Sequence, residues 1–284
     1  MNGIRARAVV FAALFLSPLL AAQSSTETPA TVVTKNPSRT DVRLGSTSYG
    51  ELSIWKITDF RSPYFGLTLV WLELRESKTL VSVERTNGAP AIPTQPPSDA
   101  LAILSGGSWT GAYDSPNSPK SASGLVVTSG SIVSALRPTQ TGGVMFACDD
   151  HLFVYDADTY SKRYARGLPC QRASALQTSF IVVGDGKATS HLPSAERANR
   201  LAIGQDDDRV IIAGAFTPVG TALTLTDFAS FVAAAAKKLG RNDLSALNLD
   251  GACSAQLSIP PIRQRFGCDR AGYNVNRIVV RREP

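Results

Sequence analysis

The sequence predicts an α+β fold, namely a strand-rich single domain with a mixed β-sheet and few helices. Apolar segments with alternating or β-branched residues recur from Tyr49 onward, and segments rich in Gly and Pro separate them; this is typical of short strands joined by turns. Only residues 224–240 have the three- and four-residue apolar spacing of a long amphipathic helix. With 284 residues, 43% of them hydrophobic, the chain is long enough to bury a core.

The N-terminal residues have the composition of an export signal. Two arginines precede the uncharged apolar run 8–20, and small residues follow at 21–22, so a secretory signal peptide over residues 1–22 is predicted. A membrane anchor is the alternative, but the run is shorter than the roughly 20 residues that a span needs. Residues 23–48 are rich in Ser, Thr and Pro and predict a flexible leader. Residues 49–284 then form the domain, which is expected in the periplasm or secreted.

The predicted strands are apolar runs that end at turn residues. In chain order they lie in residues 65–74, 78–85, 99–107, 124–136 (a hairpin around Ser129-Gly130), 143–157 (two strands), 174–184 (before the turn Asp185-Gly186), 199–216 (a hairpin with Asp206 to Asp208 near its tip) and 245–249. Residues 86–97 and 110–123 are predicted loops because of their Gly, Pro and Ser content.

The predicted helix has recognisable ends. Thr224 is a candidate N-cap, and Asp227 stands three residues later, as in a capping box. Lys237 and Lys238 occupy the last turn, where the helix dipole favours cations. Gly240 is the expected residue after the C-cap.

Export makes disulfide bonds available to the four cysteines. Four cysteines allow three pairings; the sequential pairing closes the shortest loops and is favoured. It joins Cys148 to Cys170 and Cys253 to Cys268. No CxxC spacing occurs, so the cysteines do not indicate a zinc site or a thioredoxin-type redox centre.

The charge of the chain suits anionic partners. The formal net charge is +6, or 6 − 2 = +4 once Arg5 and Arg7 leave with the signal peptide, which fits a phosphorylated sugar or glycan. Basic residues are scattered and no nucleic-acid motif occurs, so a nucleic-acid partner is not predicted. No other apolar segment is long enough to span a bilayer, so no stable membrane insertion is expected after signal cleavage.

No cofactor is predicted, although a divalent cation is compatible with the acid-rich segment 148–158. It contains Asp149, Asp150, His151, Asp156 and Asp158. Exposed strand ends with acids in their turns are the alternative interpretation. The segment does not match an EF-hand loop, so no residue is assigned as a metal ligand.

Asp250 is the strongest candidate for chemistry from the residues alone. It ends a mostly apolar strand in the segment LNLDGACSAQL, residues 247–257. Gly251 allows backbone dihedral angles that other residues resist, and the small residues 252–255 would let a ligand approach the main chain. Asp-Gly is also a common turn pair, so a plain turn is the alternative on local sequence.

A second candidate is the segment SGGSW, residues 105–109, where another apolar strand ends in glycines. It does not complete the GxSxG pattern of a serine hydrolase. Neither histidine, His151 or His191, lies in a context that suggests a catalytic triad. Arg200 opens the strand RLAIG and offers a forked cation for phosphate oxygens.

Taken in order, these segments resemble the phosphodiester glycosidase family. They are ILSGGSW, GLVVTSG, ALQTSFIVVGDGK, RLAIG, a capped helix ending KKLG, and ALNLDGACSAQL. The last segment and the helix before it are the most specific part, and the resemblance covers about residues 50–282. Bacterial members of the family are exported proteins.

The resemblance implies the residues of an active site. Asp250 and Arg200 would be catalytic. The implied substrate-binding residues, with Trp109 from the same glycine segment, are Ser105, Gly106, Gly107, Trp109, Gln177, Asn248, Gly251, Ser254 and Gln256. The departures from the family pattern are Ser105 in place of Asn, Ser179-Phe180 in place of Gly-Pro, Ala252 and Cys253 in place of glycines, and Ala255 in place of Ser.

The implied activity is hydrolysis of a sugar-1-phosphodiester, such as an N-acetylglucosamine-1-phosphodiester, by an exported glycosidase. Asp250 would act as base or nucleophile and Arg200 would neutralise the phosphate. Main-chain N–H groups near Gly106, Gly107 and Gly251 would bind its oxygens. Because side chains replace glycines in the Asp250 turn, a non-catalytic carbohydrate- or phosphoglycan-binding protein of the cell envelope is the alternative.

Overall fold

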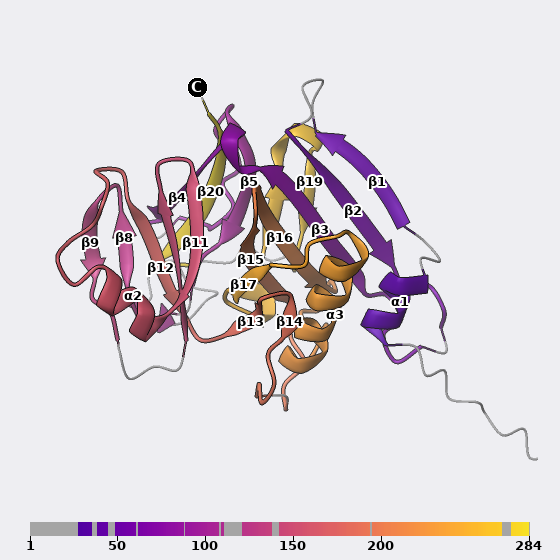
Figure 1. The fold of residues 1–284 in the computed structure, drawn as a ribbon. Helices are drawn as coiled ribbons and strands as arrows, with labels where there is room; N and C mark the ends of the chain where they lie inside the picture. Colours follow the sequence, from indigo (N-terminus) through magenta and orange to yellow (C-terminus); the bar gives the residue numbers. More distant parts are fainter. Residues whose placement is uncertain are drawn as a thin grey trace, which may run out of the picture.

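An eight-stranded antiparallel sheet is the largest layer of the computed structural model (Figure 1). The structure describes residues 28–35, 39–44, 49–60, 62–87, 89–107, 109–110, 121–137, 142–193, 195–268 and 274–283. Strands of this sheet follow the order β1 (Arg39–Leu44), β2 (Gly50–Lys56), β3 (Thr68–Arg75), β16 (Arg209–Phe216), β15 (Arg200–Asp206), β17 (Ser245–Asn248), β13 (Ile181–Gly184) and β14 (Lys187–Ala188).

Two five-stranded sheets and one short hairpin complete the strand structure. The first has the order β11 (His151–Asp156), β10 (Gly143–Cys148), β12 (Ser174–Thr178), β8 (Val126–Thr128) and β9 (Ser131–Ser134). The second has the order β19 (Gln264–Phe266), β18 (Leu257–Ile259), β5 (Ala100–Ser105), β20 (Asn276–Arg282) and β4 (Thr79–Arg85). The hairpin pairs β6 (Trp109–Thr110) with β7 (Ser121–Ala122).

All three large sheets contribute to one core, and strand alternation decides which side chains enter it. On β3, Val70 and Leu72 point into this shared core, whereas Leu69 and Trp71 point to the opposite face. The same period of two recurs on β10 with other residues. Successive side chains of a strand face opposite sides, so each of these buried strands separates two apolar layers.

Helices cover the outer faces of the sheets. α3 (Leu225–Lys238) buries Phe228 and Phe231 against the face of the eight-stranded sheet that carries Trp55 and Trp71, and α1 (Pro29–Lys35) lies beside α3 (Figure 1). α2 (Ala157–Arg163) covers part of the first five-stranded sheet. No helix in the described ranges is long and apolar enough to cross a membrane.

The α+β class, the hairpins and the α3 boundaries are confirmed. The Thr224 hydroxyl accepts the Asp227 N–H at 3.1 Å, as the capping signal predicted. One detail was wrong: every pairing among the described strands is antiparallel rather than mixed. α3 links β16 to β17 as a helical crossover links parallel strands, but β15 lies between these two strands and pairs antiparallel with both.

Part of the predicted flexible leader is structured. α1 buries Val33 completely, and β1 pairs with β2 from Arg39↔Trp55 to Leu44↔Gly50. The composition of residues 23–48 did not indicate these elements, because an edge strand needs few apolar residues when its partner strand supplies the register. The predicted signal peptide, residues 1–22, lies outside the described residues.

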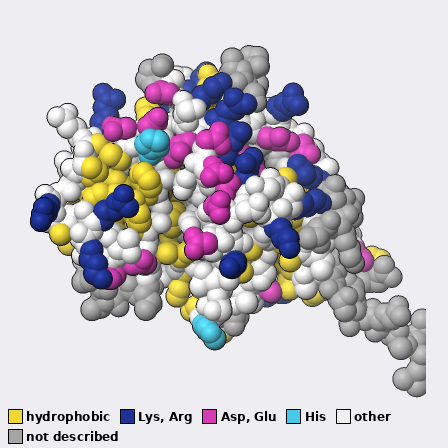
Figure 2. All heavy atoms as spheres, viewed as in Figure 1, with side chains coloured by type: hydrophobic (Ala, Val, Ile, Leu, Met, Phe, Trp, Pro, Cys, Tyr) yellow, Lys and Arg dark blue, Asp and Glu magenta, His cyan; other side chains and the backbone are white. Residues whose placement is uncertain are grey.

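The face drawn in Figure 2 mixes basic and acidic side chains over the eight-stranded sheet. Hydrophobic atoms gather instead over the first five-stranded sheet, where the half-buried Phe153 and Tyr155 stack with ring centroids 5.7 Å apart. On this face, charge is therefore interspersed rather than arranged in a stripe of one sign.

Candidate active site

Asp250 lies where the eight-stranded sheet meets β5 of the second five-stranded sheet. The chain leaves β17 at Asn248, and the Asp250 N–H donates to the Gly106 carbonyl at 3.2 Å. One carboxylate oxygen of Asp250 accepts the Gly251 N–H at 3.0 Å. The structure thus brings together the two segments that the sequence singled out, 105–107 and 248–251, although they come from different sheets.

Arg200 is the first residue of β15, on the other side of the same turn. Ala202 pairs with Asn248, so the antiparallel register, extended by two residues, sets Arg200 opposite Asp250. Arg200 Nε donates to the Leu223 carbonyl at 3.1 Å, and Nη2 donates to the Glu196 carbonyl at 2.8 Å. These two bonds fix the guanidinium plane.

The remaining nitrogen of Arg200, Nη1, faces the Gly251 turn. A Cβ added to Gly251 would lie only 3.3 Å from it. Burial lowers the pKa of the Arg200 guanidinium, and the Glu196 carboxylate opposes this shift. A cation held rigidly beside an acidic turn suits recognition of an anionic group.

Asn276, the first residue of β20, holds the glycine pair at the end of β5. Its main-chain carbonyl accepts the Gly106 N–H at 3.2 Å, and its side-chain Oδ1 accepts the Gly107 N–H at 3.0 Å. A Cβ on Gly106 would lie 1.6 Å from that Oδ1. Glycine is therefore required here by the close approach of Asn276.

This arrangement differs from the main-chain phosphate site that the resemblance implied. The N–H groups of Gly106 and Gly107 donate to Asn276, and the N–H of Gly251 donates to Asp250. Each of the three expected donors already has a protein acceptor. An anion at this turn would therefore have to be recognised by side chains.

Ser105, Ser254 and Gln256 also come together at this junction. Ser105 is fully buried, and its hydroxyl accepts the Gln256 N–H at 3.0 Å. The Ser254 N–H donates to the Gly251 carbonyl at 3.1 Å. These contacts tie the chain after Asp250 to the end of β5. Trp109 lies in β6, and its side chain lies outside the described part of the structure.

Asn248 is buried next to Asp250. Its Nδ2 donates to the Leu249 carbonyl at 2.6 Å, while its buried Oδ1 has no hydrogen-bond partner among the described residues. The Thr178 hydroxyl donates to the Asn248 carbonyl. The end of β12 therefore reaches the same junction as β5 and β17.

Gln177 holds two other chain segments with its side-chain amide. Its Oε1 accepts the N–H groups of Leu125 (3.1 Å) and Arg137 (2.9 Å), and its Nε2 donates to the Arg137 carbonyl at 2.8 Å. The side chain is 2% exposed, and its main-chain carbonyl lies 3.1 Å from where a Gly107 Cβ would be. Gln177 thus supports the loop next to the glycine pair; a direct contact with substrate stays a prediction.

The sequential disulfide pairing is confirmed. Cys148 pairs with Cys170 and Cys253 pairs with Cys268, with Cα–Cα distances of 6.0 and 5.2 Å. In the second pair, Cys253 belongs to a 3₁₀ turn, Ala252–Ser254, directly after Asp250 and Gly251. A covalent bond therefore holds the turn in which the family pattern has glycines.

Ala252 and Asn199 connect this disulfide to the strand that carries Arg200. Ala252 has a positive φ of 54°, a conformation that favours glycine. Its N–H donates to the Asn199 carbonyl at 3.1 Å. Asn199 is fully buried, and its Nδ2 lies 3.8 Å from the Cys268 sulfur.

Sequence reasoning missed three polar residues of this junction. They are Thr178, Asn199 and Asn276, which are 0–2% exposed. Each stands at the end of an apolar strand. That position was the only local signal, because the contacts that matter join residues far apart in the chain.

The acid-rich segment has structural uses. Asp156 caps α2 by accepting the Thr159 N–H at 2.8 Å, and Asp158 pairs with Lys162 at 2.6 Å. Asp149 lies within 4.8 Å of the Cys148 and Cys170 sulfurs, but those sulfurs form a disulfide and are not thiolate ligands. A divalent cation at this segment stays an untested prediction.

Two solved structures have the same fold at low sequence identity. The catalytic domain of zebrafish N-acetylglucosamine-1-phosphodiester alpha-N-acetylglucosaminidase, auto-inhibited by its pro-peptide, has a TM-score of 0.58 and 14% identity, covering 87% of this chain and 88% of that one. A hypothetical protein from Synechocystis has a TM-score of 0.53 and 12% identity, covering 87% of this chain and 64% of that one. No curated protein sequence matches significantly.

The family model for phosphodiester glycosidases matches residues 100–280. This stretch includes β5 with its glycine pair, Arg200 at the start of β15, and the Asp250 turn. The match spans more than half of the chain, so this protein belongs to the phosphodiester glycosidase family.

Proposed function

We propose that this protein is an exported hydrolase that cleaves a sugar-1-phosphodiester of the N-acetylglucosamine type. The main observation behind the proposal is that the ends of β5, β15 and β17 bring Gly106, Arg200 and Asp250 together. Asp250 is bonded to Gly106 through its main chain, and Arg200 Nη1 faces Gly251, the next residue. The family match and the activity in the name of the zebrafish neighbour support this reaction type.

In the proposed reaction, the bond between the anomeric carbon and the phosphate oxygen breaks. The phosphate monoester leaves with the bonding electron pair, and water supplies the hydroxyl group of the released sugar. Positive charge develops on the sugar ring, so the Asp250 carboxylate would stabilise it and act as base or nucleophile. A phosphate is already a good leaving group, so the reaction needs less acid catalysis than an ordinary glycoside.

Arg200 would neutralise the negative charge of the phosphate. Because Leu223 and Glu196 already hold two of its nitrogens, little side-chain entropy is lost when the third nitrogen meets an anion. The N–H groups of Gly107 and Gly251 already donate to Asn276 and Asp250. The Arg200 guanidinium is therefore the proposed anion-binding group.

The test is release of N-acetylglucosamine from an N-acetylglucosamine-1-phosphodiester by the disulfide-intact protein. Asp250→Asn should reduce turnover by about 10²–10⁴-fold. Its melting temperature should stay close to wild type, since an amide oxygen can still accept the Gly251 N–H. Retained turnover in this variant would overturn the role of Asp250.

Arg200→Gln should lower kcat/KM by about 10–100-fold, the contribution of a charged hydrogen bond. Arg197→Gln is the matched control, because Arg197 lies three residues away, is exposed, and stacks on Tyr64 with its guanidinium 4.9 Å from the ring centroid. Equal losses in the two variants would mean that general positive charge, rather than Arg200, is responsible.

A second candidate function is non-catalytic binding of a carbohydrate or phosphoglycan. The turn after Asp250 favours this function, because side chains at Ala252 and Cys253 stand where the family pattern has glycines. Ala252 adopts a positive φ there, and a disulfide bond to Cys268 holds Cys253. Saturable binding of the same phosphodiester without release of sugar, unchanged by Asp250→Asn, would support binding over hydrolysis.

Export is part of the proposal. The signal-like composition of residues 1–22 and the two disulfides fit an oxidising compartment outside the cytoplasm. Cleavage of the chain near Ala22 in an exported sample, read by mass spectrometry, tests this part separately.

A further inference from the structure

A pocket of about 290 Å³ lies at the end of β5 away from the candidate active site. Ala100 and Leu101, at the start of β5, line it, whereas Gly106 and Gly107 follow the end of this strand. Six residues of extended strand separate the two places by roughly 17–20 Å. The pocket is thus distinct from the Asp250 junction.

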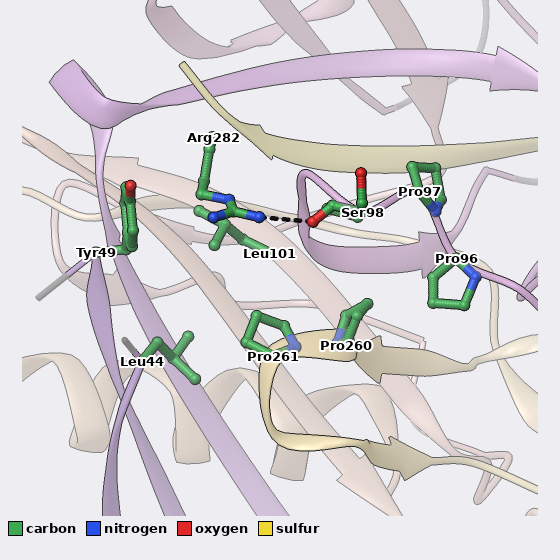
Figure 3. A pocket seen from close by; sticks show the side chains of 10 residues that line it. Leu44, Tyr49, Pro96, Pro97, Ser98, Leu101, Pro260, Pro261 and Arg282 are labelled. Atoms are coloured by element: carbon green, nitrogen blue, oxygen red, sulfur yellow. Dashed lines mark hydrogen bonds between the residues drawn. The ribbon is translucent and has the colours of Figure 1, made fainter. Parts of the chain in front are cut away.

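The walls of this pocket are apolar. Figure 3 shows Pro96 and Pro97 on one side, Pro260 and Pro261 below, and Leu44 facing them. Proline has no main-chain N–H to offer a ligand. In the turn before β5, the Ala100 N–H is used internally, because it donates to the Pro97 carbonyl at 3.1 Å. The body of a ligand in this pocket would therefore be apolar.

One cation reaches across the pocket. Arg282 Nη2 donates to the Ser98 carbonyl at 2.6 Å, and its guanidinium carbon lies 6.0 Å from the centre of the Tyr49 ring (Figure 3). This bond sets the guanidinium between Ser98 and Tyr49, at the polar edge of the apolar walls.

Arg282 differs from the other arginines of β20. Arg277 and Arg281 form ion pairs with Glu84, and Arg281 also pairs with Asp99. Among the described residues, no carboxylate lies within 4.0 Å of the Arg282 guanidinium. Its charge therefore stands at the pocket without a described counter-ion.

We propose that this pocket binds a small amphipathic anion. The apolar body would lie among the prolines, Leu44 and Leu101, and the anionic head would bind the Arg282 guanidinium. The volume is near the lower end of small-molecule sites, about 300–1,000 Å³, so the ligand is a short alkyl or single-ring acid. This site is independent of the proposed hydrolase activity.

The probe is octanoate, titrated calorimetrically into the disulfide-intact protein at neutral pH, with 1-octanol and octyl phosphate in parallel. Both anions should bind saturably, and 1-octanol about tenfold more weakly or not at all, since it lacks the charge. A preference for octyl phosphate over octanoate would identify the head group as a phosphate. No saturable binding, or equal affinity for 1-octanol, would overturn the proposal.

Two variants test the position of the site. Arg282→Gln should weaken octanoate binding about tenfold or more. The control is Arg265→Gln, because Arg265 is also exposed and donates to a carbonyl of the same loop, that of Pro93 at 2.9 Å, but does not line the pocket. Ser98→Trp should block the pocket while keeping the main-chain carbonyl that Arg282 uses. Unchanged binding in Arg282→Gln or in Ser98→Trp would overturn the assignment.

Discussion

The main-chain N–H of Asp250 donates to the main-chain carbonyl of Gly106 at 3.2 Å. This bond joins two segments that leave different sheets, so the position of the carboxylate depends on the path of the glycine pair. Asn276 fixes that path by accepting both glycine N–H groups. The packing around Gly106 therefore controls the geometry at Asp250.

Gly106→Ala should destabilise the protein and lower activity. The new Cβ would lie 1.6 Å from Asn276 Oδ1 and 2.7 Å from the Asn276 carbonyl oxygen. Because main chain must move, we expect a loss of about 1–3 kcal/mol or more in the free energy of unfolding, measured by urea denaturation. Gly184→Ala in β13 is the control, since a Cβ there meets no atom within 4 Å. Equal stability of the two variants would contradict the role given to Asn276.

Gln177→Ala should destabilise the protein without removing any group that the proposed reaction uses. The change leaves the buried N–H groups of Leu125 and Arg137 without their acceptor, at a cost of about 1–3 kcal/mol for each buried group. Gln205→Ala is the control, because Gln205 makes an exposed bond to Asp207 at 2.8 Å. If Gln177→Ala instead raised KM at unchanged stability, Gln177 would contact the substrate directly.

Ala252→Gly should be neutral or stabilising, by up to about 1 kcal/mol, because it relieves a left-handed conformation that disfavours a side chain. Ala255→Gly, three residues later, should destabilise the protein, since Ala255 is fully buried with an ordinary φ of −70°. Thermal unfolding of both variants measures the difference. If Ala252→Gly instead destabilised the protein, the positive φ of Ala252 would not be a source of strain in the folded state.

Removing the Cys253–Cys268 bond by a double change to Ala should cost about 3 kcal/mol, the chain-entropy value for a closed loop of 15 residues. It should also lower activity, because the bond holds the turn after Asp250. Removing Cys148–Cys170, with a separation of 22 residues, should cost a similar free energy but leave kcat closer to wild type. Unfolding and turnover measured together separate the two effects, and equal losses of kcat would contradict a specific role for the first bond.

Local signals predicted the elements that local contacts determine. Thr224 caps α3 through a residue three positions away, and the hairpin at Ser129-Gly130 has positive φ at both residues. Asp250, the segment 105–109 and Arg200 were candidates from the residues alone, and the resemblance of several segments to one family then implied that they share one site. Asn276 escaped notice because its partner, Gly107, is 169 residues away in the chain. No short pattern encodes such a contact.

Glu76 predicts how stability depends on pH. Glu76 lies in the 3₁₀ turn between β3 and β4 and is 7% exposed. One of its carboxylate oxygens accepts the Leu152 N–H at 2.6 Å, and the other lies 3.6 Å from His151 Nδ1. Burial raises the pKa of the Glu76 carboxyl above the ordinary value of 4.5, and the hydrogen bond from Leu152 and the nearby His151 oppose this only in part. The folded protein therefore binds this proton more tightly than the unfolded chain.

A raised folded-state pKa means that the contribution of Glu76 to stability is fully present below pH 4.5 and is lost as pH rises through the folded value. Glu76→Gln keeps an oxygen for the Leu152 N–H and removes the ionisation. The variant should gain stability relative to wild type as pH increases from about 4.5 to 7. Asp156 gives the opposite sign, because its bonds from Thr159 lower its pKa, so its contribution is lost as pH falls. Urea denaturation of Glu76→Gln between about pH 4.5 and 7, and of Asp156→Asn as pH falls below the ordinary aspartate pKa of 3.8, measures the two slopes. A Glu76→Gln variant that loses stability relative to wild type as pH rises would contradict the assignment.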